Sequence, residues 1–275
     1  MKKPSKISII SLANFRKNFI EQKNRILKWT YMAAIILIAV LAVVTAIPAI
    51  NTIIVAVSAT PRQLPIYSVE RDDRKISISF DAAWGAEDLD ALLETLAEFD
   101  VRTTFFVCGY WVEKYPEEVK RIHAAGHDIG NHGDTHAHGA QLNLEQNKQE
   151  IMGTHEKVKE LLGIEMDLFR PPYGEYNNTV ISAADALGYF TIQWNVDSHD
   201  WQNKGPRHQI NQVLDHENLD DGAIILFHSD AKDTPITLRP ILEGLIEKGF
   251  EIVPISELIH REGFTIDSAG RQRLN

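Results

Sequence analysis

Cysteine is almost absent from the chain, because Cys108 is the only one among 275 residues. A single cysteine excludes an internal disulfide. Cys108 ends an apolar run that begins at Thr103, so we expect the thiol to be packed in the interior rather than to act as a nucleophile. Internal repeats and low-complexity segments are also absent. The fractions of hydrophobic (44%) and charged (24%) residues are typical of one large folded domain or two small ones.

Positive charge is scarce beyond the first 28 residues. Residues 1–28 contain eight Lys or Arg and one Glu, a balance of +7, whereas the whole chain has a net charge of −10. The remaining residues therefore carry −17. So acidic a region is a poor candidate for binding nucleic acid, because the phosphate backbone is bound by clustered Lys and Arg.

Charge of either sign is missing from Tyr31 to Ile50, and the apolar character continues to Val57. About 20 apolar residues suffice to cross a bilayer as a helix. Because Lys and Arg precede this stretch, the sequence predicts a basic cytoplasmic segment (1–28), a transmembrane signal anchor (29–57) and an extracytoplasmic remainder. Such a protein crosses the cell membrane once and contacts lipid through residues 31–57. A cleavable signal peptide with a small-residue site at Val57–Ala59 is the alternative, although the apolar run is longer than a usual signal core.

Three segments are expected after the anchor: a linker (58–74), a folded domain (75–262) and a loose polar tail (263–275). Within the folded domain, strand-like and helix-like segments alternate. The expected strands are Ile76–Phe80, Thr103–Val107, His127–Asn131, 167–170, Tyr189–Val196, Ala223–His228 and Phe250–Pro254. The expected helices are Leu89–Phe99, one from Pro116 to the residue before Gly126, Leu144–Leu162, Asn178–Leu187, Pro206–Glu217 and Leu238–Lys248. This alternation predicts an α/β domain with a parallel sheet, either closed as a barrel or open and doubly wound.

Ionisable residues suited to catalysis follow the predicted strands. In parallel α/β folds, functional residues gather at the carboxyl ends of the strands. The residues in question are Asp81 after the first strand, His132 and His136 after the third, Arg170 after the fourth, Asp197 and Asp200 after the fifth, and His228 after the sixth. His132 and His136 are four residues apart, so a helical turn would let them share one cation. A His-rich surface loop is the alternative for that stretch alone, but the convergence of all these groups favours a metal site.

These groups suggest a division of labour for metal-assisted hydrolysis. The two imidazoles would hold a divalent metal that polarises a carbonyl group and lowers the pKa of a bound water. Asp81 would be the general base, kept ionised by Arg170, and His228 would be the general acid. An Asp of the segment 197–201 would fix the tautomer of His228.

Two aromatic residues complete the expected site. Tyr173 and Trp201 would form a wall or floor for a sugar ring. Taken singly, these residues have simpler explanations: Arg170 in a structural ion pair, and Trp201 and His228 in the core. Taken together, in this order at one rim, they favour the catalytic interpretation.

At this point the sequence resembles the polysaccharide deacetylase family with the NodB-homology domain, carbohydrate esterase family 4. The resemblance covers about residues 74–260 and five ordered motifs. The matching segments are Ser79–Asp81, His132–His136, Arg170–Gly174, Asp197–Trp201 and Leu226–His228. The resemblance implies an incomplete (β/α) barrel with seven strands. It also implies that Asp81 is the base, that Arg170 orients it, that a backbone amide near Tyr173 helps to hold the oxyanion, and that Pro172 belongs to the substrate-binding motif.

One departure from the family pattern concerns the metal. The first family motif usually has a second Asp, which is the third metal ligand, and Ala82 stands at that position here. Alanine cannot bind a metal, so the third ligand would be Asp81, Asp134, His138 or a water, with His138 the best protein candidate outside the motif. Low metal affinity, or loss of catalysis, would be the other consequences. The sequence Asp-Ala-Ala-Trp-Gly from Asp81 to Gly85 resembles a branch found in spore-forming bacteria, often with an N-terminal membrane segment.

The expected function is therefore metal-dependent removal of N-acetyl groups from amino sugars by a membrane-anchored extracytoplasmic enzyme, with Zn²⁺ or Co²⁺ as the cofactor. The expected partner is the glycan of the cell wall or spore cortex, with chitin-like chains a weaker alternative. A non-catalytic glycan-binding protein is the first rival, because of Ala82. A hydrolase of another acyl group, such as an O-acetyl ester, is the second.

Overall fold

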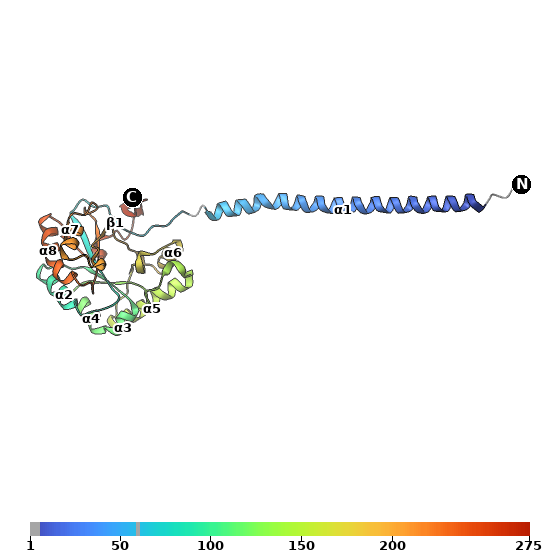
Figure 1. Cartoon of the computed structure of the whole chain (residues 1–275). Helices are drawn as coiled ribbons and strands as arrows, with labels where there is room; N and C mark the ends of the chain where they lie inside the picture. Colours follow the sequence, from blue (N-terminus) through green and yellow to red (C-terminus); the bar gives the residue numbers. More distant parts are fainter. Residues whose placement is uncertain (1–5, 59–60) are drawn as a thin grey trace. The chain divides into compact units, whose positions relative to one another are not determined.

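The computed structural model of the chain describes residues 6–58 and 61–275 (Figure 1). Its contacts divide the chain into two units, residues 1–61 and 62–275, which we describe separately. Parts of two expected segments, residues 1–5 of the basic segment and residues 59–60 of the linker, lie outside the described residues.

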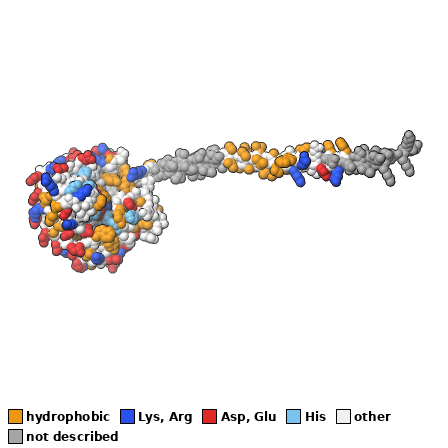
Figure 2. Space-filling model, viewed as in Figure 1, with side chains coloured by type: hydrophobic (Ala, Val, Ile, Leu, Met, Phe, Trp, Pro, Cys, Tyr) orange, Lys and Arg blue, Asp and Glu red, His pale blue; other side chains and the backbone are white. Residues whose placement is uncertain are grey.

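The first unit is one helix, α1 (Lys6–Ser58), in which the expected basic segment and anchor are continuous. Its residues 15–45 are long and apolar enough to cross a membrane, and a signal sequence would meet the same criterion. Figure 2 shows hydrophobic side chains along this part of the helix. Length and composition therefore do not distinguish a transmembrane span from a signal sequence, and the membrane topology stays a prediction.

The main sheet of the second unit is parallel throughout and has the order β6-β5-β4-β3-β2-β8-β7, with β9 paired to the start of β2. The strands are β2 (Lys75–Ala82), β3 (Thr104–Val107), β4 (Asp128–Asn131), β5 (Leu168–Phe169), β6 (Phe190–Thr191), β7 (Val196–Asp197), β8 (Ile224–His228) and β9 (Glu251–Ile252). The predicted α/β fold, an incomplete barrel with a seven-strand path, is confirmed.

Helices surround this sheet (Figure 1). They are α2 (Leu89–Glu98), α3 (Gly109–Lys114), α4 (Pro116–Ala124), α5 (Leu144–Leu162), α6 (Asn178–Ala186), α7 (Pro206–Leu214), α8 (Thr234–Glu247) and α9 (Ile255–Leu258). Local signals explain several ends: a capping box between Asn143 and Gln146 starts α5, and Gly163 ends it with φ 73°. The sequence did not predict α3 or α9, and α8 begins one turn earlier than expected.

One predicted strand, Tyr189–Val196, is two separate strands. β6 and β7 lie at opposite edges of the sheet, and residues 192–195 connect them across the opening of the barrel. The connecting backbone forms other hydrogen bonds: the Gln193 amide donates to the carbonyl of Ile66 at 2.7 Å, and the Asn195 amide donates to the carbonyl of Ile224 at 3.2 Å. An apolar run cannot reveal such partners, which is why the break was not predicted.

Strand β2 separates two environments by simple alternation. Ile76, Ile78, Phe80 and Ala82 belong to the large apolar cluster that also contains core residues of α2 and α8, and Ala82 is fully buried there. Ser77, Ser79 and Asp81 alternate with them. The prediction that Cys108 is packed in the interior is also confirmed.

A small second sheet occupies positions that were expected to be irregular. It joins β1 (Ser68–Val69), β11 (Arg271–Leu274) and β10 (Phe264–Ile266), in that order. Strand β1 belongs to the expected linker, and β10 and β11 belong to the expected loose tail. Gln272 of β11 is fully buried and exchanges two hydrogen bonds of 2.8 Å with the backbone of His260. These strands have only two to four residues each, and the partner of β1, strand β11, is about 200 residues away, so local patterns do not indicate the sheet.

Gly222 offers a test of how this small sheet is fixed to the domain. It has φ +78°, and an added Cβ would lie 1.8 Å from the carbonyl oxygen of Val69. Gly188 has the same φ but open space around its missing Cβ. We expect Gly222→Ala to lower the free energy of unfolding by more than about 2 kcal/mol, and Gly188→Ala by about 1 kcal/mol. Urea unfolding of both variants measures the difference, and equal losses would contradict the close approach at Val69.

Candidate active site

Asp81 and Arg170 form a buried ion pair at the carboxyl end of the sheet. Arg170 has no exposed surface, and its Nη1 donates to Asp81 Oδ1 at 2.8 Å. Its Nη2 donates to the carbonyl of Gln193 at 3.3 Å, and the guanidinium lies 4.2 Å from the ring centroid of Phe106. Burial raises the pKa of Asp81, but Arg170, with His132 and His228, outweighs it and lowers the pKa. Asp81 is therefore an ionised carboxylate.

His132 lies directly against this pair. Its Nδ1 is 2.7 Å from the backbone carbonyl of Arg170, which can only accept, so Nδ1 carries the hydrogen. The Nε2 atom, 3.5 Å from Asp81 Oδ2, then presents its lone pair. This carbonyl contact is the usual way in which a protein orients a metal-binding imidazole.

His136 is the second imidazole of the expected metal pair. The rings of His132 and His136 have centroids 5.0 Å apart. Burial, followed by the neighbouring His132, lowers the pKa of His136 to about 4. Within the described residues, its Nδ1 is buried without a hydrogen-bond partner. Both pKa values are lowered, so both rings are neutral near pH 7, which is the form that binds a metal.

Two of the side chains considered for the third metal position, Asp134 and His138, have other partners. Asp134 Oδ1 accepts from Lys157 at 2.6 Å, and His138 stacks on Tyr173 while its Nδ1 lies 3.0 Å from Glu175. Ala82 has no donor atom. Among the residues that the structure describes, no group of three His, Cys, Asp or Glu side chains is arranged to hold a metal. The chain thus offers two imidazole ligands, and the remaining positions around a metal would fall to Asp81 or water.

His228 and Asp200 form a second pair beside the first. Asp200 accepts from the backbone amide of His228 at 2.7 Å, and its Oδ1 lies 2.8 Å from Nδ1 of the same residue. Thr234 also donates to Asp200, at 3.0 Å. Burial lowers the pKa of His228, but the bond to Asp200 outweighs it and raises the pKa to about 9. His228 is therefore a cation near pH 7. Asp197, in contrast, accepts from the amide of His199 at 2.8 Å, which stabilises the local turn.

Most of the predicted site residues line one pocket of about 620 Å³. They are Asp81, His132, His136, Tyr173, Asp197, Asp200, Trp201 and His228. Three others lie outside the lining: Arg170 behind Asp81, Pro172 buried, and His138 at the exposed side of Tyr173. The backbone at Tyr173 has φ 60°, an unfavourable value for a non-glycine residue, which is often found at functional sites.

With this geometry, the similarity to known proteins is specific. A model of the family named polysaccharide deacetylase matches residues 68–192. A peptidoglycan-N-acetylglucosamine deacetylase of Bacillus cereus is 32% identical over 198 residues, which cover 70% of this chain and 92% of that protein. The chain belongs to the polysaccharide deacetylase family. The hydrolase class expected from the motifs agrees with the name of this relative.

Other similar proteins include a protein described as a pseudoenzyme and a protein described as uncharacterised. The crystal structure of a carbohydrate esterase family 4 pseudoenzyme from Bacillus anthracis has a TM-score of 0.68 and 29% identity, and covers 72% of this chain and 69% of that one. A mutant of that protein is described as having restored enzymatic activity. The uncharacterised YlxY protein of Bacillus subtilis is 30% identical over 195 residues, which cover 71% of this chain. This chain spans 60% of the length of YlxY.

The pocket of this polysaccharide deacetylase family member also contains residues that the sequence did not single out, among them Trp84, Trp194, Asp230 and Lys232. Trp84 follows Asp81 by three residues, so its place beside the first motif was a usable signal. Burial raises the pKa of Asp230. Asp230 and Lys232 lie two and four residues after His228, the last residue of β8 and of the fifth motif. The sequence did not indicate that their side chains face the pocket.

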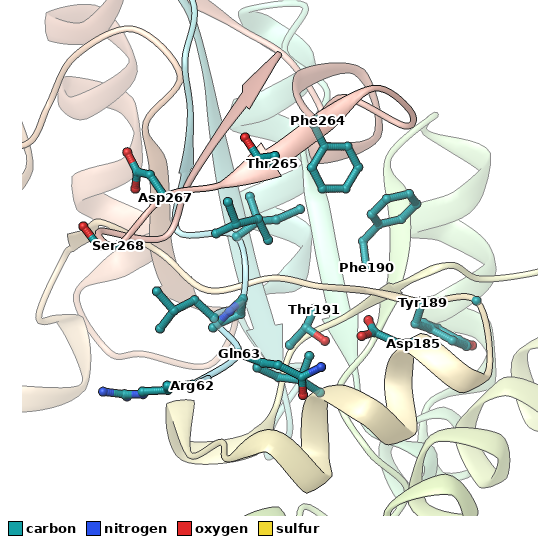
Figure 3. Close-up of a pocket in the computed structure, with 16 residues that line it drawn as sticks. Arg62, Gln63, Asp185, Tyr189, Phe190, Thr191, Phe264, Thr265, Asp267 and Ser268 are labelled. Atoms are coloured by element: carbon teal, nitrogen blue, oxygen red, sulfur yellow. The ribbon is translucent and has the colours of Figure 1, made fainter. Parts of the chain in front are cut away.

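A second pocket, of about 680 Å³, lies elsewhere in the domain (Figure 3). It is lined by residues 62–66, by the end of α6 with the segment to β6, and by β10 with the residues after it. Phe190 and Phe264 face each other there with ring centroids 6.2 Å apart. None of the predicted site residues lines it. The smaller pocket, with its acid–base groups, is therefore the candidate active site.

Proposed function

We propose that this protein is a membrane-anchored extracytoplasmic deacetylase that hydrolyses N-acetyl groups on amino sugars of cell-wall or spore peptidoglycan. The observation that carries the proposal is the adjacency of an ionised carboxylate and a protonated imidazole. Asp81 and His228 are register partners on β2 and β8, and both line the same pocket. Hydrolysis of an amide needs a base for the attacking water and an acid for the leaving amine. The ionised Asp81 can accept a proton, and the protonated His228 can donate one.

The neighbouring residues support separate tasks for the two groups. Arg170 holds Asp81 ionised and directs Oδ1 away from the pocket, which leaves Oδ2 for the attacking water. Asp200 fixes the Nδ1 hydrogen of His228, so that Nε2 carries the proton given to the leaving nitrogen. A divalent metal such as Zn²⁺ or Co²⁺, held by His132 and His136, would polarise the acetyl carbonyl and acidify the water. Tyr173 and Trp201 would contact the sugar.

A catalytically impaired glycan-binding protein is the second candidate, and one observation favours it. Ala82 removes the usual third protein ligand, and two of the side chains that were expected to replace it, Asp134 and His138, have other partners, which leaves Asp81 or a water. A family member from Bacillus anthracis is described as a pseudoenzyme. Weak metal binding with an intact pocket would give a protein of this kind.

Acetate release separates the two candidates. We expect the full-length chain in detergent to release acetate from peptidoglycan when Zn²⁺ or Co²⁺ is added, and the His132→Ala and Asp81→Asn variants to release none above background. His123→Ala is the matched control, because His123 is exposed on α4 and does not line the pocket, and it should keep the wild-type rate. O-acetylated glycan, tested in parallel, distinguishes an esterase. Tight glycan binding without acetate release under any metal would instead identify the binding protein.

A further inference from the structure

Exposed aromatic side chains are concentrated at one place in the domain. Within residues 62–275, the large aromatic side chains classed as exposed are Trp84 (60%), Tyr173 (52%) and Trp201 (57%). All three line the pocket that contains Asp81 and His228. Exposed tryptophans cost hydration free energy, so their gathering at one rim indicates a ligand with apolar faces.

Trp84 is held in place although its ring is exposed. It lies in the turn after β2, where the buried indole of Trp111 donates to the carbonyl of Gly85 at 3.0 Å. On the other side, the Gly85 amide donates to Asp230 at 3.4 Å. Because the backbone of this turn is fixed on both sides, little backbone conformational entropy is lost when a ligand binds to the Trp84 ring.

Trp84 and Tyr173 flank the same imidazole. The ring of His136 has its centroid 5.6 Å from Trp84 and 4.4 Å from Tyr173, and both contacts are edge-to-face. Tyr173 in turn stacks on His138 at 4.2 Å. Aromatic rings therefore extend to either side of the candidate metal ligand, which is a wider platform than one sugar requires.

We propose that Trp84 is a glycan-binding residue that, together with Tyr173 and Trp201, holds several successive sugars of an amino-sugar chain. The inference rests on the proposed glycan substrate and adds a residue, Trp84, that binds sugars next to the one that carries the acetamido group. Pyranose rings have apolar C–H faces that pack on tryptophan, and their equatorial polar groups remain at the edge of the stack. A polar acetamido group can then enter between Asp81 and His228 while neighbouring sugars pack on the aromatic rim.

The test is the dependence of affinity on chain length. Calorimetric titration of the full-length chain in detergent with the monomer, trimer and hexamer of N-acetylglucosamine should show rising affinity. Trp84→Ala should weaken hexamer binding on the order of tenfold and leave monomer binding unchanged, whereas Trp84→Phe should keep most of the affinity. Ile236→Ala is the matched control, because Ile236 is 64% exposed on α8 and lies outside the pocket.

Each outcome has a definite meaning. Equal hexamer affinity in wild type and Trp84→Ala overturns the inference, as does equal weakening in Trp84→Phe or in Ile236→Ala. An affinity that rises with the length of the sugar chain and depends on Trp84, but without acetate release, supports the inference and counts against deacetylation. Failure of the wild-type chain to bind any of the three sugars overturns both.

Discussion

Replacement of Arg170 by methionine is expected to destabilise the domain by about 3–5 kcal/mol at pH 7. Arg170 is fully buried, and its guanidinium is the cation that compensates Asp81, which is also buried. Without it, the buried carboxylate would lose its main counter-charge and its hydrogen bond of 2.8 Å. Urea unfolding followed by tryptophan fluorescence measures the loss.

The pH dependence of this loss identifies its cause. Asp81 has a lowered pKa in the folded state, so its pair with Arg170 stabilises the protein above the ordinary carboxyl pKa of 3.8 and ceases to do so as the pH falls through the lowered value. In Arg170→Met, burial is less opposed, Asp81 becomes neutral at a higher pH, and the deficit should shrink on acidification. The double variant with Asp81→Asn should recover part of the stability at pH 7.

A surface pair provides the control for this prediction. Lys120 and Glu117 lie 2.8 Å apart with both side chains exposed, so Lys120→Met should cost less than about 1 kcal/mol. If Arg170→Met lost no more stability than Lys120→Met, or if its loss grew on acidification, the buried ion pair would not have the proposed role.

The second large effect concerns His228 and alkaline pH. The folded-state pKa of His228 is raised from 6.5 to about 9, mainly by Asp200 acting against burial. A group with a raised pKa stabilises the fold fully below its unfolded pKa and loses that contribution as the pH rises through the folded value. We therefore expect unfolding free energy to fall by about 3 kcal/mol between pH 6.5 and pH 9.

Two carboxylate variants separate this contribution from other titrations. Asp200→Asn removes the partner charge, so the variant should be less stable at pH 6.5 and should show little further loss up to pH 9. Asp197→Asn should keep most of the wild-type slope, because Asp197 makes the smaller contribution to the raised pKa. The same slope in wild type and Asp200→Asn would contradict the assignment. If it holds, His228 stays protonated throughout the neutral range.

The sequence was sufficient to predict site residues where ionisable side chains stand at the ends of predicted strands. Asp81, His132 and His228 each follow a strand with a clear apolar pattern, so the rule that parallel strands end at one edge placed them together. The helical turn expected for His132–His136 shows the limit of that reasoning. Gly133 (φ 76°) and His136 (φ 56°) are both left-handed, so this segment is not helical, although the two imidazole rings still have centroids 5.0 Å apart.

Other features depended on contacts that a single sequence does not reveal. Asp134 is drawn to Lys157 of α5, 23 residues away, and Gln272 is buried because it bonds the backbone of His260. Neither partner is marked by spacing or composition. Trp84 lies in the segment Asp81–Gly85 that the sequence analysis quoted, but the exposure of its ring is a property of the folded turn.

The two-point attachment of the chain next to its N-terminal helix has a mechanical consequence. Ile66 bridges Ile192, and Ser68 and Val69 pair in parallel with Arg271 and Gln272. Tension arriving along the polypeptide from α1 would load these backbone hydrogen bonds together, in shear, before it reached β2. If the N-terminal end were pulled while the pocket held a ligand, these hydrogen bonds would break first, and the spacing of Asp81 and His228 would be preserved.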